Sequence, residues 1–209
     1  MSSAKVKTYQ FVCGTGRCGS KALRYLLMLQ RSTIMLHSGC PLGWNGTTNG
    51  AAGALVAKLA NLGADRVGDI APWYLPYVNA LVGSLSAKVV CLQRSKVDTV
   101  NSLMRQPVDH CSLVPEIGTE PTEDDQGLLP KFPGSRLEAA EAYYDSYYAA
   151  AAAWVLEYPS SFMLFPVSAL DTEEGQREIL DFFGYPRDRQ RLGTARPEFT
   201  RYSCRLFGA

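Results

Sequence analysis

The chain has 209 residues, of which 46% are hydrophobic and 20% are charged, and its formal net charge is +1. This length and composition are typical of one globular domain with a sizeable core, so we expect a single domain over residues 1–209. The near-zero charge excludes a global electrostatic field for nucleic acid or for an anionic membrane surface, and any anion must therefore bind at a local site.

Hydrophobic periodicity predicts that strands and helices alternate along the chain. A β-prone run over residues 9–13 ends at Gly14, and Leu23, Leu26 and Leu27 recur behind it at helical spacing. Further strands are expected over residues 32–36, 65–70, 88–93 and 161–167, and further helices over residues 54–62, 74–85, 97–104, 136–157 and 172–183. The pattern predicts an α/β fold: a three-layer sandwich with a mainly parallel central sheet and a P-loop-like strand, loop and helix at the N-terminus.

Two segments lack such periodicity. Residues 38–53 are rich in Gly, Asn and Thr, and residues 106–135 contain five prolines. We expect the first to be a loop and the second to be a long loop or lid inserted in the domain.

The N-terminus shows no apolar run of a signal peptide, and no stretch approaches the roughly 18 apolar residues of a membrane span. The six cysteines form no CxxC pair and no spaced Cys/His signature. The sequence therefore predicts a reduced, cytoplasmic protein without a metal site, a nucleic-acid partner or a membrane partner.

The segment FVCGTGRCGSK, residues 11–21, carries the strongest functional signal. Its glycines let the backbone turn sharply and bring several N–H groups to one anion, and the following helix adds the positive end of its dipole. Arg17 supplies a fixed charge, and Ser20 and Lys21 are hydrogen-bond donors. The predicted anion-binding residues of this glycine-rich loop (residues 14–21) are Gly14, Thr15, Gly16, Arg17, Cys18, Gly19, Ser20 and Lys21.

Two common nucleotide-binding patterns fit this loop only in part. Gly14 and Gly19 have the spacing of GxxxxGK[ST], but Lys21 occupies the position of the hydroxyl that binds Mg²⁺, which argues against a kinase or ATPase. The loop also matches GxGxxG, but no acidic residue follows at the expected distance, which argues against a dinucleotide site. A tight strand-to-helix turn without a ligand is the structural alternative.

A second motif lies at the end of the expected strand over residues 88–93. Arg94 follows that strand directly, and Ser102 comes eight residues later, two turns into the next expected helix. Because ligands of α/β folds bind at the carboxyl ends of parallel strands, we expect the two side chains to bind one phosphate together.

The loop and the second motif together resemble the sulfotransferase family. That family has a glycine-rich 5′-phosphosulfate loop, such as GxxRSGTT, and a 3′-phosphate motif in which a strand ends in Arg with Ser eight residues on. The resemblance extends weakly through residues 130–133 and 172–184. Lys21 departs from the family's second hydroxyl residue, and the cytosolic enzymes' RxGxxGxWK motif is absent.

The resemblance implies a metal-independent transferase that moves a sulfuryl group from PAPS (3′-phosphoadenosine 5′-phosphosulfate) to a small-molecule acceptor and releases PAP. Arg17 would stabilise the leaving 5′-phosphate, and Arg94 and Ser102 would bind the 3′-phosphate. Arg196, Arg201 and Arg205 are candidates for the missing C-terminal charge.

The general base stays open among three residues. Family enzymes place an acid or a histidine at the end of a strand between the two motifs, which makes Asp69 the first candidate and His37 and His110 the others. Four aromatic residues are candidates either for the acceptor pocket or for the core: Trp44, Trp73, Tyr74 and Phe132. The alternative functions are a P-loop nucleotide or small-molecule kinase and a non-catalytic nucleotide-binding protein of the same fold.

Overall fold

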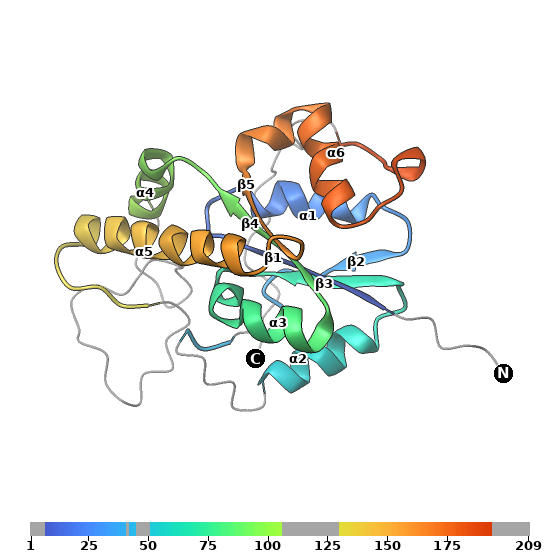
Figure 1. The fold of residues 1–209 in the computed structure, drawn as a ribbon. Helices are drawn as coiled ribbons and strands as arrows, with labels where there is room; N and C mark the ends of the chain where they lie inside the picture. The colour runs from blue at the N-terminus through green and yellow to red at the C-terminus, as the bar shows by residue number, and fades with distance from the viewer. Residues whose placement is uncertain (1–6, 41, 45–50, 106–129, 194–209) are drawn as a thin grey trace, which may run out of the picture.

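The computed structural model describes residues 7–40, 42–44, 51–105 and 130–193. Within these residues, five strands form one sheet in the order β2-β3-β1-β4-β5, and every pairing is parallel (Figure 1). The strands are β1 (Thr8–Cys13), β2 (Thr33–Met35), β3 (Arg66–Ile70), β4 (Lys88–Gln93) and β5 (Phe162–Pro166).

Helices cover both faces of this sheet, as Figure 1 shows. The α-helices are α1 (Ser20–Met28), α2 (Ala51–Ala60), α3 (Val78–Leu85), α4 (Lys96–Met104), α5 (Arg136–Glu157) and α6 (Glu173–Phe182). Short 3-10 helices are η1 (Pro72–Tyr77), η2 (Val167–Asp171) and η3 (Arg187–Arg189).

Successive residues of β1 point to opposite faces of the sheet, which divides the core into two clusters. Phe11 and Cys13 pack with α2, α3 and α5, whereas Val12 packs with α1 and α6. These two apolar layers confirm the predicted α/β sandwich. They also explain the continuous apolar run of β4, which is covered on both sides.

Two predicted elements differ from those observed. The predicted helix over residues 74–85 is wrong in its first part, because residues up to Tyr77 form η1 and a proline at position 76 lies inside it. The predicted loop over residues 38–53 is wrong at its end, because α2 already begins at Ala51 and includes Gly53. Favourable apolar packing of α2 outweighs the modest cost of one glycine in a helix.

The strand order creates a crevice at the carboxyl edge of the sheet. β1 and β4 are neighbours, but β1 leads into α1 on one face and β4 leads into α4 on the other. The two connections leave the sheet in opposite directions, so the strand ends between them stay open, as at the ligand sites of other open α/β sheets. Within the described residues, no helix has the length and apolarity needed to cross a membrane.

Candidate functional site

The glycine-rich loop turns back on itself between β1 and α1. Gly14, Gly16 and Gly19 have φ angles of 151°, 77° and 87°, a region that side chains disfavour. Two of these positions also lack space for a side chain: a Cβ at Gly14 would lie 2.4 Å from Cys18 Sγ, and one at Gly19 would lie 2.3 Å from Val167 Cγ2. The glycines are therefore required by the turn itself.

The turn leaves the N-terminus of α1 ready for an anion. No side chain caps the helix, and its first turn contains no acidic residue. Backbone N–H groups at such a terminus carry partial positive charge and attract phosphate or sulfate. Arg17 lies in the loop with a left-handed φ of 57°, and its side chain is exposed.

The second motif meets the loop directly, although the two are separated by 77 or more positions in the chain. Arg17 Nε donates a hydrogen bond to Ser102 Oγ at 3.0 Å, and Arg94 Nη1 donates to the Arg17 carbonyl oxygen at 3.3 Å. Arg94 Nε also lies 3.8 Å from a carboxylate oxygen of Asp98 on α4. The fold thus brings two arginines and a hydroxyl to one place.

A cavity of about 470 Å³ opens at this point. Its lining combines the loop, the second motif and the ends of neighbouring strands: Cys13, Gly14, Gly16, Arg17, Cys18, Gly19, Ser20, Lys21, His37, Ser38, Ile70, Ala71, Pro72, Arg94 and Ser102. The described lining contains three arginine or lysine side chains and no Asp or Glu, so its electrostatics favour an anionic ligand. Ten of the twelve predicted site residues lie here, and their roles stay predictions.

Cys18 lies among the cavity-lining residues, but its side chain is shielded from solvent. Its side chain is buried beneath Gly14, and burial raises the pKa of the thiol to about 12. The thiol therefore stays protonated and does not act as a nucleophile.

His37 lies on the other wall of the cavity, just after β2. Its Nε2 lies 3.5 Å from Ser20 Oγ. Partial removal from water, followed by the positive charges of Arg24 and Lys21, lowers the pKa of His37 below its ordinary value. The imidazole is therefore neutral near pH 7 and can accept a proton.

Thr15 and Asp69, the other two predicted site residues, lie outside the described cavity lining. The Thr15 side chain is buried beneath the loop, where its hydroxyl donates to the Gly16 carbonyl oxygen at 3.2 Å and contacts the Tyr148 hydroxyl. Its position is suited to holding the loop from below.

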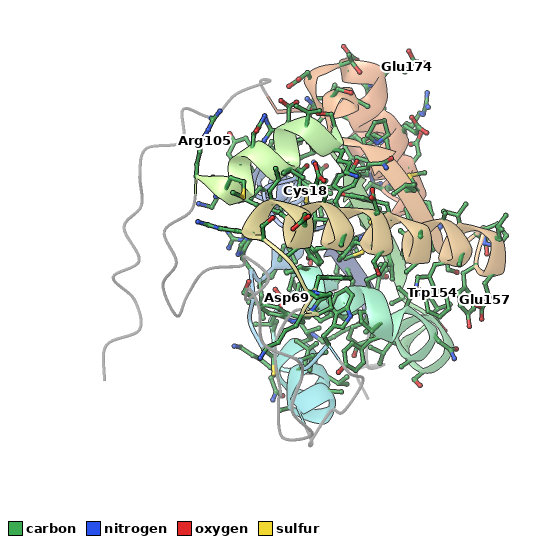
Figure 2. All side chains as sticks on the ribbon, turned by 90° about the vertical axis from the view of Figure 1, so that its left-hand side faces the viewer. Cys18, Asp69, Arg105, Trp154, Glu157 and Glu174 are labelled. Carbon is green, nitrogen blue, oxygen red and sulfur yellow. The ribbon has the colours of Figure 1, made fainter. Side chains whose placement is uncertain are left out.

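Asp69 is fully buried and its carboxylate accepts three hydrogen bonds. It accepts from Tyr74 Oη at 2.6 Å, from the Gly39 N–H at 2.7 Å and from the Ile70 N–H at 2.7 Å. Burial raises the pKa of Asp69, and these hydrogen bonds oppose part of that rise. In the view of Figure 2, Cys18 of the loop lies above α5 and Asp69 below it. Through its bond to the Gly39 N–H, Asp69 holds the segment that carries His37, and it does not line the cavity.

The aromatic candidates pack in the core on the α5 side of the sheet. Trp73 and Tyr74 are buried, and Trp44 and Phe132 pack against Tyr143 of α5. Several predictions fall outside the described residues: His110, residues 106–129 of the predicted loop or lid over 106–135, and the C-terminal arginines Arg196, Arg201 and Arg205. Those predictions stay open.

Sequence reasoning missed a set of tyrosines beneath the site. Four hydroxyls of α5 hydrogen-bond to the backbone of the loop and of the strand ends, at Tyr143, Tyr144, Tyr147 and Tyr148. The signal was present in the spacing of these residues, since positions three or four apart lie on one helix face and a buried hydroxyl requires a partner.

No protein-family model and no curated protein matches the sequence. The structure is similar to a sulfotransferase from Alicyclobacillus acidocaldarius, with a TM-score of 0.55 and 12% identity over 94% of this chain and 87% of that one.

It is also similar to mouse sulfotransferase SULT7A1 complexed with PAP, with a TM-score of 0.50 and 12% identity. That match covers 86% of this chain and 60% of the mouse chain, so this chain spans less than two thirds of the mouse protein. These two similarities show that this chain has the sulfotransferase fold.

Proposed function

We propose that the protein is a PAPS-dependent sulfotransferase that acts on a hydroxyl or an amine of a small-molecule acceptor. The contact of Arg17 with Ser102 at 3.0 Å carries this proposal, because it joins the glycine-rich loop to the second motif beside one cavity. Two anion-binding groups around one cavity match a donor that carries phosphates at the 3′ and the 5′ positions of its ribose. The fold shared with a sulfotransferase complexed with PAP supports the same ligand.

On this proposal, the loop and the N-terminus of α1 hold the 5′-phosphosulfate. Arg94 and Ser102 hold the 3′-phosphate, with Arg17 between the two groups. Their placement around one cavity supports these roles, since guanidinium groups and hydroxyls form charge-assisted hydrogen bonds with phosphate.

The transfer step displaces a phosphate oxygen from sulfur. The acceptor oxygen or nitrogen forms a bond to sulfur, the bond from sulfur to the bridging 5′-phosphate oxygen breaks, and its electron pair leaves with PAP. Arg17 stabilises the charge that develops on that oxygen. The proton of the acceptor passes to Nε2 of neutral His37, whose place in the cavity wall and lowered pKa support this role over that of Asp69.

A calorimetric titration with PAP, ADP and ATP, first in EDTA and then with Mg²⁺, tests the proposal. We expect micromolar PAP binding in EDTA and much weaker ADP binding, because ADP lacks the 3′-phosphate. Tight ATP binding that requires Mg²⁺, without a preference for PAP, would overturn the proposal in favour of a kinase. PAP binding without PAPS turnover on an acceptor panel would indicate a non-catalytic protein.

A further inference from the structure

One face of α5 presents four tyrosines to the carboxyl edge of the sheet. Tyr143, Tyr144, Tyr147 and Tyr148 are each 9% exposed or less. Their rings pack on one another, with centroids 4.6 Å apart for Tyr144 and Tyr148 and 5.6 Å apart for Tyr143 and Tyr147. Mutual packing leaves each ring little freedom, so the hydroxyl positions are set by the helix.

Tyr147 joins the two walls of the cavity. Its hydroxyl oxygen accepts a hydrogen bond from the Gly14 N–H at 2.8 Å, and its O–H donates to the Pro72 carbonyl oxygen at 2.8 Å. Gly14 and Pro72 both line the cavity, the first on the glycine-rich loop and the second after β3. One buried hydroxyl therefore sets the spacing between them.

Tyr144 acts on the second motif in the same way. Its O–H donates to the Arg94 carbonyl oxygen at 2.8 Å, at the point where β4 has just ended. Tyr148 donates to the Leu92 carbonyl oxygen at 2.8 Å, and Tyr143 donates to the Thr15 carbonyl oxygen at 3.2 Å. The face thus contacts the backbone of the glycine-rich loop and of the segment that carries Arg94.

These hydroxyls are reliable donors. Burial raises the pKa of Tyr143, Tyr147 and Tyr148, so their O–H groups stay protonated over the working range of pH. A buried carbonyl or N–H that loses its partner is costly, so removal of one hydroxyl moves the backbone that it held.

We infer that Tyr147 and Tyr144 are positioning residues for the donor nucleotide, Tyr147 for the glycine-rich loop and Tyr144 for Arg94. The inference rests on the proposed function, in which the loop holds the 5′ side of the nucleotide and Arg94 holds the 3′-phosphate. The two tyrosines therefore affect different parts of the same ligand.

The test compares the affinities of PAP and ADP for Tyr147→Phe, Tyr144→Phe and the wild type. Tyr147→Phe is expected to weaken both nucleotides about tenfold, because both use the loop. Tyr144→Phe is expected to weaken PAP about tenfold while ADP affinity stays within about twofold, because ADP lacks the 3′-phosphate. A general loss of stability would not separate the two ligands in this way.

Tyr185→Phe is the matched control. Tyr185 is also buried, its hydroxyl bonds to Gln10 Oε1 at 2.8 Å and Thr33 Oγ1 at 3.0 Å, and neither partner lines the cavity. We expect a comparable loss of stability with unchanged affinity for PAP and ADP.

Amide hydrogen exchange of Gly14 gives a readout that needs no nucleotide. In Tyr147→Phe this amide loses its acceptor and is expected to exchange at least about tenfold faster than in Tyr185→Phe. If the wild type binds PAP but both α5 variants behave like Tyr185→Phe, the positioning role is overturned. If the wild type binds neither nucleotide, the proposed function fails, and the Gly14 exchange rate alone decides whether Tyr147 holds the loop.

Discussion

Arg17 occupies an unusual backbone position for a charged residue. Its φ of 57° lies in the left-handed region, and it is held there by Arg94 at its carbonyl and Ser102 at its side chain. A residue other than glycine is strained in this region of backbone conformation. Such strain persists where the surrounding contacts hold the residue in that conformation. Arg17 is thus placed by the same residues that complete the candidate site.

Arg17→Ala is expected to lower PAPS turnover by about 10²- to 10³-fold, because charge on the leaving oxygen loses its stabilising cation. PAP affinity should fall by less, since the loop N–H groups and Arg94 remain. PAP release with an acceptor panel measures turnover, and Arg17→Lys is the control that keeps the charge. Equal losses of turnover and of PAP affinity would contradict a role in the transfer step.

Arg94→Ala is expected to weaken PAP about 10- to 100-fold and to leave ADP affinity within about twofold, because only PAP carries the 3′-phosphate. Lys96→Ala is the matched control, since Lys96 is a neighbouring cation that pairs with Asp145 and does not line the cavity. Titration calorimetry measures both affinities. Unchanged PAP binding in Arg94→Ala would remove the 3′-phosphate assignment.

The pH profile separates His37 from Asp69 as the base. A base must be unprotonated, and the pKa of His37 is lowered, so kcat/KM should fall as pH drops through a value below ~6.5. His37→Gln should lose this acidic limb together with most of the turnover. Asp69→Asn, as control, should keep the limb and lose stability, because an amide cannot accept all three of the hydrogen bonds to Asp69. An acidic limb that persists in His37→Gln would show that another group is the base.

At the scale of the elements, glycines have opposite roles in β3 and in α2. A Cβ at Gly68 of β3 would lie 1.7 Å from the Gln10 carbonyl oxygen of β1, whereas a Cβ at Gly53 of α2 would meet nothing within 4 Å. The pairing of β1 with β3 positions the end of β3 and the cavity-lining Pro72 that follows it, so close packing of the two backbones is part of the site's support.

The same substitution should therefore have opposite effects at the two positions. Gly68→Ala is expected to cost more than about 3 kcal/mol of unfolding free energy, because the sheet backbone must move. Gly53→Ala should stabilise the protein by about 0.5–1 kcal/mol, since alanine loses less conformational entropy in a helix. Urea unfolding measures both, and a mild effect at Gly68 would show that β1 and β3 can separate without loss of the fold.

At the scale of the whole molecule, the site is assembled from β1, β3, β4, α1, α4 and α5, so a nucleotide that binds it should stabilise the entire fold. At a PAP concentration one hundredfold above Kd, linkage predicts about 2.7 kcal/mol of added stability. The gain should be the same in EDTA and in Mg²⁺ and smaller for ADP at the same concentration. Thermal unfolding measures it, and a gain seen only with ATP and Mg²⁺ would contradict a site for PAP.

The amino-acid sequence by itself determined the class of fold and most of its elements. The strand Lys88–Gln93 and the helix Arg136–Glu157 have the predicted bounds. An unbroken apolar run indicates the strand and the helical pattern between Ser135 and Tyr158 indicates the helix, and both signals are local. The glycine-rich loop was likewise predictable, since its turn depends on residues within one short segment. Local signals were weaker at η1, where a proline interrupts an otherwise helical pattern.

Only the tertiary structure decided how the candidate site is built. It joined Arg17 to Ser102, buried Asp69 against Tyr74 rather than in the cavity, and placed Tyr147 between Gly14 and Pro72. Apart from the pairing of Asp69 with Tyr74, these contacts link residues 75 to 133 positions apart. Periodicity and turn chemistry act over a few residues, whereas a contact between distant side chains depends on how whole layers pack, and packing is a property of the assembled core.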